Sequence, residues 1–164
     1  MCNGGDPVQG FIFAENNSLC TEAAYPYTGA NGSDWEHCHQ EQNGCKIVPG
    51  STPTSYTNVP QTEAALLAAV AQQPVSIAMD ASCPGFMQYA GGLWTEDCGT
   101  KIDHALLVVG YGVDEASGKP FWKVKNSWGE GWGEDGYVRL QRGLAGKGGH
   151  GISDIASTAT FPAM

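Results

Sequence analysis

The chain has 164 residues, of which 41% are hydrophobic and 15% charged, and this is the composition of a globular domain rather than of a disordered chain. Its formal net charge is −9, with 8 Lys and Arg against 17 Asp and Glu, which argues against nucleic-acid binding because phosphate backbones require clustered cations. No apolar run approaches the roughly 20 residues of a membrane-spanning helix, and we expect no signal peptide before Cys2 and no membrane partner.

The first sixty residues predict one short helix followed by irregular structure. Pro7 suits the first turn of a helix and Asp6 can cap it, so we expect a helix from about Pro7 to Glu15. Residues 19–60 are interrupted by prolines and glycines and contain three of the cysteines. We therefore expect an irregular stretch fastened by cysteines, with one short strand at most.

The remaining residues predict one helix and a series of strands. Residues 62–73 are rich in Ala, Leu, Glu and Gln and end before a proline, which indicates a helix. Residues 75–79 predict a strand, and residues 105–112 predict a second that is buried throughout because it is entirely apolar. Residues 121–126 and 137–140 alternate, which is typical of a sheet with one face in water. The pattern predicts an α+β fold that includes a small antiparallel β-barrel.

Six cysteines favour disulfides and an oxidising compartment, since the number is even and no Cys-x-x-Cys pair occurs. The sequons that begin at Asn16 and Asn31 fit a secretory route. His37-Cys38-His39 followed by Cys45 does not have zinc-finger spacing, so we expect no metal and no cofactor. A metal-binding structural domain is therefore the least favoured of the possible functions.

Two residues stand out as candidates for chemistry. His104 precedes an apolar strand and Asn126 follows another, and each alone is typical of a structural residue. Together they indicate catalysis, because an imidazole that acts as a base needs a second group to hold its tautomer and orientation. Tryptophans directly after the asparagine can shield such a hydrogen bond from water, which strengthens it.

The sequence resembles the papain family of cysteine proteases over essentially its whole length. The similar segments occur in the family's order. They are Cys2-Asn3-Gly4-Gly5, Tyr25-Pro26-Tyr27, Asp103-His104-Ala105 with Gly110-Tyr111-Gly112, Lys125-Asn126-Ser127-Trp128-Gly129-x-Gly131-Trp132-Gly133-x-x-Gly136-Tyr137, and Phe161-Pro162.

The resemblance implies a thiolate–imidazolium mechanism with His104 as the histidine, Asn126 as the residue that orients it, and Trp128 as the indole that covers their bond. The family's Cys-Gly-[Ser/Ala]-Cys-[Trp/Tyr] signature, which carries the nucleophile, does not occur in this chain. The chain therefore resembles the C-terminal three-quarters of a mature protease, and we expect it to be inactive alone. The missing N-terminal segment is expected as a second chain or as a removed part.

The resemblance also implies how a peptide binds. Two glycines of the Cys-x-Gly-Gly loop bond the substrate backbone, because a side chain there would hold the peptide away. Apolar residues line the pocket for the side chain two residues before the cut, which predicts a preference for Leu, Val or Phe. The implied substrate-binding residues are Gly4, Gly5, Pro7, Ala78, Asp103, Ala105, Ile155 and, as a wall on the leaving-group side, Trp132.

The resemblance divides the chain into residues 1–50, the remaining part of the helical lobe, and residues 51–164, a β-rich lobe that carries the histidine and asparagine. It also implies which cysteines pair. The partner that the family normally provides for Cys98 near the C-terminus is missing, so Cys83–Cys98 is expected as a substitute. The other implied pairs are Cys20 with Cys45 or Cys38, and bridges from Cys2 and one of Cys38 or Cys45 to the missing segment.

Two functions of different classes remain. The first is a cathepsin-L-like endopeptidase that is lysosomal, vacuolar or secreted and has peptide or protein substrates and cystatin-like inhibitors as partners. The alternative is a non-catalytic relative that serves as a binding, inhibitory or storage protein. Retention of both His104 and Asn126 favours the enzyme, since a binding protein does not need a proton-transfer pair.

Overall fold

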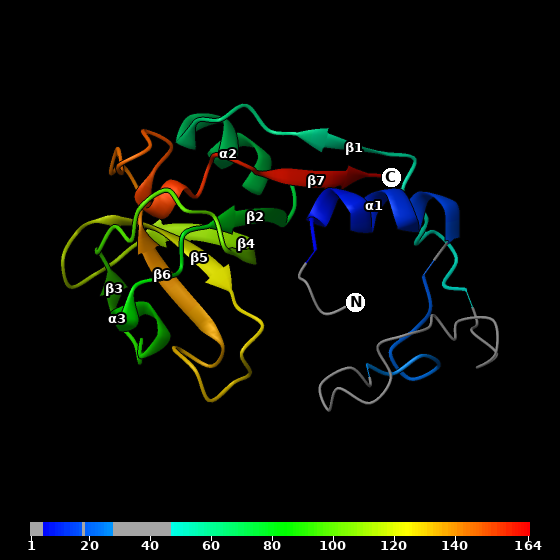
Figure 1. The fold of residues 1–164 in the computed structure, drawn as a ribbon, viewed down its shortest axis with the longest axis horizontal. Helices are drawn as coiled ribbons and strands as arrows, with labels where there is room; N and C mark the ends of the chain where they lie inside the picture. The colour runs from blue at the N-terminus through cyan, green and yellow to red at the C-terminus, as the bar shows by residue number, and fades with distance from the viewer. Residues whose placement is uncertain (1–4, 18, 28–46) are drawn as a thin grey trace. The chain divides into compact units, whose positions relative to one another are not determined.

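The structure, a computed structural model, describes residues 5–17, 19–27 and 47–164. It divides into two compact units, which are residues 1–57 with 162–164 and residues 58–161 (Figure 1). We refer to these as unit 1 and unit 2. The expectations that concern Gly4, the His37-Cys38-His39 segment, Cys2 and Cys45 lie outside the described residues.

Unit 1 contains the predicted N-terminal helix. Helix α1 spans Pro7–Asn17, two residues longer than expected, and the Asp6 carboxylate accepts a hydrogen bond from the Val8 N–H at 2.9 Å. The longer helix is consistent with its last two asparagines, whose side-chain amides donate to carbonyls one turn back. Only Ala14 of this helix is buried.

Beyond α1, the described part of unit 1 is largely irregular, as the sequence predicts. Cys20 forms an isolated β-bridge with Ile47 and is disulfide-bonded. The one short strand expected is β1, Ser55–Asn58.

Unit 2 holds most of a seven-stranded sheet with the order β1-β7-β2-β4-β5-β6-β3. Its central strands pair antiparallel, and β3 pairs parallel with β6. The mixed helix and sheet content confirms the α+β class. The strands are β2 Val75–Met79, β3 Leu93–Trp94, β4 His104–Val113, β5 Pro120–Lys125, β6 Tyr137–Gln141 and β7 Thr160–Ala163, and the helical segments are α2 Glu63–Val70, α3 Pro84–Met87 and the 3₁₀ turn η2 Ile152–Asp154.

Helix α2 is confirmed, but it ends earlier than its composition predicts. The Thr62 side chain caps it by accepting the Ala65 N–H at 3.1 Å. At the other end the N–H groups of Gln72 and Gln73 both donate to the Ala69 carbonyl, which closes a turn instead of a further helical turn. The following proline disfavours helical backbone at Gln73, which accounts for the shorter helix.

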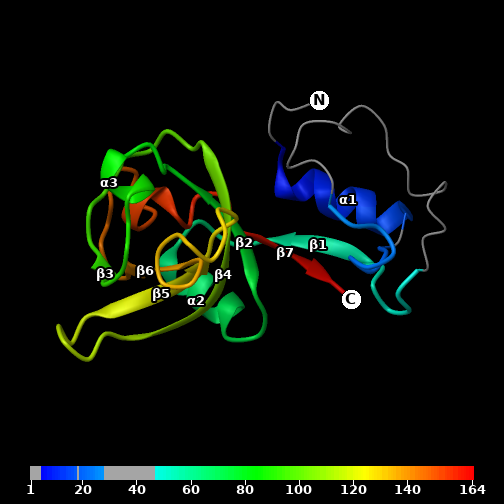
Figure 2. The same ribbon diagram turned by 90° about the horizontal axis from the view of Figure 1, so that it is seen from below.

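Strand β4 is present, but the prediction that it is buried throughout is wrong. Only Leu106 and Val108 of its ten residues are buried, while Tyr111 is 46% and Val113 61% exposed. The pairing with β5 shifts register between Val108 and Gly110, and beyond this bulge the two strands continue as a projecting hairpin (Figure 2). The apolar run is therefore divided between a core segment and an exposed arm.

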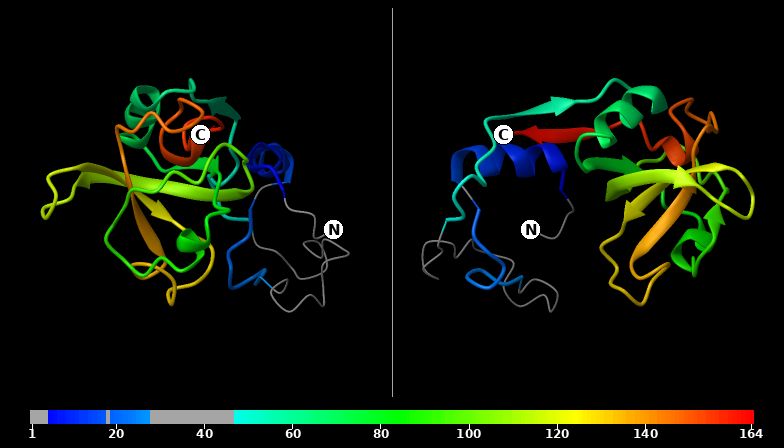
Figure 3. Two further views of the ribbon diagram at one scale, coloured as in Figure 1. Left: turned by 60° about the vertical axis from the view of Figure 1, so that its left-hand side comes forward. Right: turned by 180° about the vertical axis from the view of Figure 1, so that it is seen from behind.

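The core of unit 2 lies between the sheet and the segments that cover it. Helix α2 packs against β2 and β4, and η2 packs against β2 (Figure 3). Burial alternates along β2 and β5, so every second side chain points into this core. The largest fully buried side chains include Trp122, Phe86, Leu66, Ile77, Met79 and Leu140.

We expect Asp154→Gly to stabilise unit 2. Asp154 has a left-handed φ of +63°, is 8% exposed, and has a buried carboxylate oxygen without a hydrogen-bond partner in the described chain. Removing the strain and the orphaned oxygen raises the free energy of unfolding by about 1–3 kcal/mol, measured by urea denaturation. Asp135→Gly is the control, because Asp135 has a φ of +54° but is exposed. Equal effects of the two changes would show that burial of the Asp154 carboxylate costs nothing.

Candidate active site

The two candidate catalytic residues meet at one edge of the sheet in unit 2. His104 is the first residue of β4 and Asn126 directly follows β5. The strands are antiparallel, with Leu107 opposite Lys125, so the start of β4 lies beside the end of β5. The His104 Nε2 and the Asn126 Oδ1 are 2.9 Å apart, and Asn126 is only 7% exposed.

A second hydrogen bond fixes which way the Asn126 amide faces. The Ser127 backbone N–H donates to the same Oδ1 at 2.7 Å, so this atom must be the acceptor. The His104 Nε2 therefore donates, which leaves Nδ1 as the atom that gains and loses a proton. Within the described chain Nδ1 has no hydrogen-bond partner, so it is free to exchange a proton with a reacting group.

The indole of Trp128 covers this pair. Its ring stacks on the His104 imidazole with a centroid distance of 4.8 Å and an interplanar angle of 27°. Trp128 is 41% exposed, so one part of the indole remains in contact with solvent. The indole keeps water from one face of the imidazole, which strengthens the hydrogen bond to Asn126.

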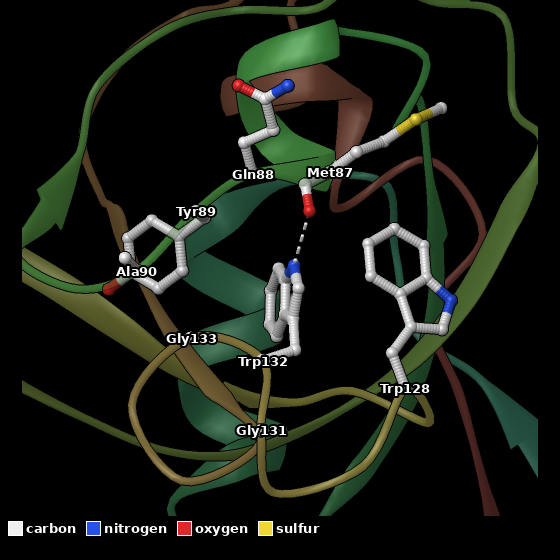
Figure 4. A pocket seen from close by; sticks show the side chains of 8 residues that line it. All are labelled: Met87, Gln88, Tyr89, Ala90, Trp128, Gly131, Trp132 and Gly133. Carbon is white, nitrogen blue, oxygen red and sulfur yellow. Dashed lines mark hydrogen bonds between the residues drawn. The ribbon is translucent and has the colours of Figure 1, made fainter.

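Trp132 packs against Trp128, with ring centroids 5.2 Å apart, and borders a cavity of about 560 Å³. Its Nε1–H is shared between the Phe86 carbonyl at 3.2 Å and the Met87 carbonyl at 3.1 Å. In Figure 4 Trp132 lies between Tyr89 and Trp128 with its nitrogen directed at the Met87 carbonyl. The lining consists of Met87, Gln88, Tyr89, Ala90, Trp128, Gly131, Trp132 and Gly133, so Trp132 and Trp128 share one wall of an open cavity.

An ion-pair cluster that the sequence analysis missed holds the loop between β5 and β6. Glu134 accepts two N–H groups of Arg139, at 2.9 Å from Nε and 2.8 Å from Nη2, and also the Gly92 N–H. Asp114 binds the Nη1 of the same guanidinium. Hydrogen bonds from Arg139 hold the pKa of Glu134 below its ordinary value despite the opposing effect of burial, and the same contacts raise the pKa of Arg139.

Acidic side chains also fix the segment that leads into His104. The exposed Asp103 accepts the Ala81 N–H at 2.9 Å, and Asp80 accepts the Lys101 N–H at 2.9 Å. Burial raises the pKa of Asp80, but hydrogen bonds from Ser82 and Lys101 outweigh this effect and lower it. These carboxylates tie the residues before β4 to the residues after β2.

The predicted apolar pocket is only partly consistent with the structure. Ala78 and Ala105 are register partners on β2 and β4, and neither is fully buried. The side chain of Ile155 is completely buried in the core of unit 2. The exposed Thr158 lies beside Ala78, and its Oγ1 accepts the Ala78 N–H at 3.2 Å.

The remaining expected residues belong to unit 1 or lie outside the described chain. Gly5 is exposed, and Pro7 is the half-buried first residue of α1. Gly4 is not among the described residues. Within the described ranges, no group of three or more His, Cys, Asp or Glu side chains is arranged to hold a metal ion. No helix there is long and apolar enough to cross a membrane.

The Cys83–Cys98 disulfide, expected from the resemblance, is present in unit 2. The β-rich fold and the shielded imidazole–carboxamide pair match the arrangement that the resemblance implies for the histidine-bearing part of a papain-like protein. The comparisons with known proteins agree. The papain family cysteine protease model matches residues 1–162, and the chain belongs to this family.

Several plant proteases are similar to the chain. It is 44% identical over 163 residues to cysteine proteinase EP-B 1 of Hordeum vulgare, covering 98% of this chain and 42% of that protein. It is 43% identical to cysteine proteinase COT44 of Brassica napus, covering 98% of this chain and 46% of that protein. The chain thus spans less than half the length of these relatives.

Solved structures confirm the papain-like fold. The Carica candamarcensis cysteine protease CMS1MS2, solved in complex with E-64, has a TM-score of 0.83 and 36% identity over 99% of this chain and 70% of that chain. The ragweed pollen allergen Amb a 11, solved in its proform, has a TM-score of 0.86 and 38% identity over 99% of this chain and 47% of that chain.

We expect Glu134→Gln to lower stability near neutral pH but not in acid. Because the folded-state pKa of Glu134 is depressed, its stabilising contribution is full above the ordinary pKa of 4.5 and is lost as the pH falls through the lower folded value. The variant should lose about 1–3 kcal/mol of unfolding free energy at pH 7, and the difference should shrink in acid. Urea denaturation at a series of pH values measures this difference in unfolding free energy.

Glu130→Gln, at an exposed position of the same loop, is the control and should have little effect. A pH-independent difference for Glu134→Gln would contradict the ion-pair explanation.

Proposed function

We propose that the chain is the histidine- and asparagine-bearing part of a papain-like cysteine endopeptidase. The observation that carries the proposal is the 2.9 Å contact between the His104 Nε2 and the Asn126 Oδ1, which leaves Nδ1 to exchange a proton. In the reaction a cysteine thiolate attacks the scissile carbonyl, and the imidazolium gives its proton to the leaving amine. Water then hydrolyses the thioester with His104 as base, and the thiolate and imidazolium are restored.

The nucleophile is proposed to come from a segment that is not part of this chain. Two observations support this. The nucleophile signature is absent from the sequence, and the chain covers 70% of the CMS1MS2 chain to which it is similar. In addition, the buried Nδ2 of Asn126 lacks a hydrogen-bond partner among the described residues, and a backbone carbonyl of such a segment can accept from it. The chain alone is then inactive, and residues 1–50 are the remaining part of the helical lobe.

The proposed substrates are peptides with an apolar side chain two residues before the cut. Ala78 and Ala105 offer small apolar side chains close to His104, which adjoins Ala105 in β4. Small residues leave room for Leu, Val or Phe. Gly4, Gly5 and Pro7 keep the substrate-binding roles that the resemblance implies.

The proposed location is an oxidising or acidic compartment, either vacuolar or lysosomal or outside the cell. The Cys83–Cys98 disulfide supports it, because disulfides rarely persist in a reducing cytosol. Inhibitors of the E-64 type are expected to bind once the nucleophile is present, since E-64 is bound in the solved CMS1MS2 and bromelain structures. Cystatin-like proteins are the proposed protein inhibitors.

The test joins the chain to a segment that carries the family's nucleophile motif and measures hydrolysis of a peptide with Leu before the P1 residue. His104→Ala should lower turnover by about 10²–10⁴-fold or more, because both thiolate formation and amine protonation depend on the imidazole. Asn126→Ala should lower it by a smaller factor, since the imidazole stays but loses its orientation.

His150→Ala is the matched control, because its Nδ1 bonds the Gln61 carbonyl instead of Asn126. Full activity in His104→Ala would rule out the proposed mechanism. A folded assembly that binds the peptide without cleaving it would instead support the non-catalytic alternative. Intact mass with and without reductant should show whether a second chain is disulfide-linked to this one.

A further inference from the structure

The Cys83–Cys98 disulfide joins the N-terminal end of α3 to the segment that precedes His104 in the chain. Cys83 is the N-cap residue of α3, and its carbonyl accepts the Phe86 N–H at 3.0 Å. Cys98 lies six residues before His104, in the segment that Asp80 and Asp103 tie to the end of β2. The bridge has no role in the proton-transfer chemistry described above, so its position calls for a separate explanation.

The four-residue helix α3 is hydrogen-bonded to the loop between β5 and β6, which carries Trp128 and Trp132. The Trp132 Nε1–H is shared by the carbonyls of Phe86 and Met87, as described above. Two residues after α3, the Tyr89 carbonyl accepts the Gly133 N–H at 3.1 Å. The loop between β5 and β6 is thus hydrogen-bonded to Phe86 and Met87 of α3 and to the segment that follows it. A helix as short as α3 has few internal hydrogen bonds, so its position depends on its attachments.

The position of α3 in turn determines where Trp128 lies. Phe86 and Trp132 both pack against the Trp128 ring in T-shaped pairs, with centroid distances of 5.8 Å and 5.2 Å and interplanar angles of 72° and 84°. Phe86 is fully buried, whereas Trp128 is 41% exposed and stacks on the imidazole. Packing against these two rings therefore holds the Trp128 indole beside His104.

We propose that Cys83 and Cys98 are positioning residues for His104. Their disulfide links two routes to the imidazole. One route runs from Cys83 through α3, the Trp132 hydrogen bond and the Trp128 ring contacts to His104. The other follows the chain from Cys98 to His104. By anchoring α3 it keeps the Trp128 ring stacked on the imidazole, and so keeps the imidazole aligned with Asn126. The catalytic meaning of this alignment rests on the proposed function, but the alignment itself does not.

The structure offers a control that separates positioning from general stabilisation. The Ser153 Oγ accepts the Cys98 N–H at 3.1 Å, so a cysteine at position 153 places a sulfur near Cys98. In the variant Cys83→Ser/Ser153→Cys, Cys98 can form a disulfide that tightens unit 2 but leaves α3 without a covalent anchor. The variant Cys83→Ser/Cys98→Ser has neither bridge.

The experiment measures the His104 Cε1–H signal by NMR in the chain itself, at one fixed pH, with His104→Gln to assign the signal. In the parent chain the stacked indole should displace this signal upfield through its ring current. We expect Cys83→Ser/Cys98→Ser to lose most of the displacement and to have a lower thermal midpoint. Cys83→Ser/Ser153→Cys should recover the midpoint without recovering the displacement. Recovery of both, or an unchanged displacement in the variant without a bridge, would overturn the proposal.

A second variant keeps the test decisive if the chain without the bridge does not fold. Trp132→Phe retains the disulfide and a ring but removes the N–H that binds α3. The proposal expects it to lose displacement as the bridge variant does, and an unchanged signal would overturn it. Because the NMR signal requires no nucleophile, a chain with the expected displacements but no activity in the hydrolysis test would contradict only the proposed function.

Discussion

The candidate site depends on one hydrogen bond, from the His104 Nε2 to the Asn126 Oδ1. A carboxamide is neutral, so it orients the imidazole without the charge that a carboxylate would bring. Its own orientation has to be set by other atoms, and the Ser127 N–H does this by donating to the same oxygen. The Nδ1 atom of the imidazole is then left without a hydrogen-bond partner among the described residues. Geometry alone thus assigns the roles of both ring nitrogens.

The surroundings of this bond are built from two independent supports. On one side, the strand pairing of β4 with β5 brings the histidine and the asparagine to the same edge of the sheet. On the other, the loop after Asn126 is held by the Glu134–Arg139 ion pair and by the hydrogen bonds from Trp132 and Gly133 to the α3 region. The first support determines that the pair meets, and the second determines that Trp128 covers it.

The sequence predicted the regular elements where local signals are strong. Thr62 caps α2 as a threonine before an Ala-rich run should, and alternation correctly predicted β5 and β6. It predicted less where the outcome depends on distant residues. The apolar run of β4 gave no sign that half the strand leaves the core at a bulge. Helix α3 was missed because four residues carry no periodicity.

For the candidate site, the sequence predicted which residues meet. His104, Asn126 and Trp128 were identified because their types and spacing form a motif, and the Cys83–Cys98 bridge was expected because the family's usual partner of Cys98 is missing. The side chains around that motif were settled by contacts between segments that are distant in the chain. These contacts placed the exposed Thr158 beside Ala78 and buried Ile155, three residues earlier, in the core. The tertiary structure likewise paired residues that are far apart in the chain, such as Glu134 with Gly92, through a fold that no local pattern encodes.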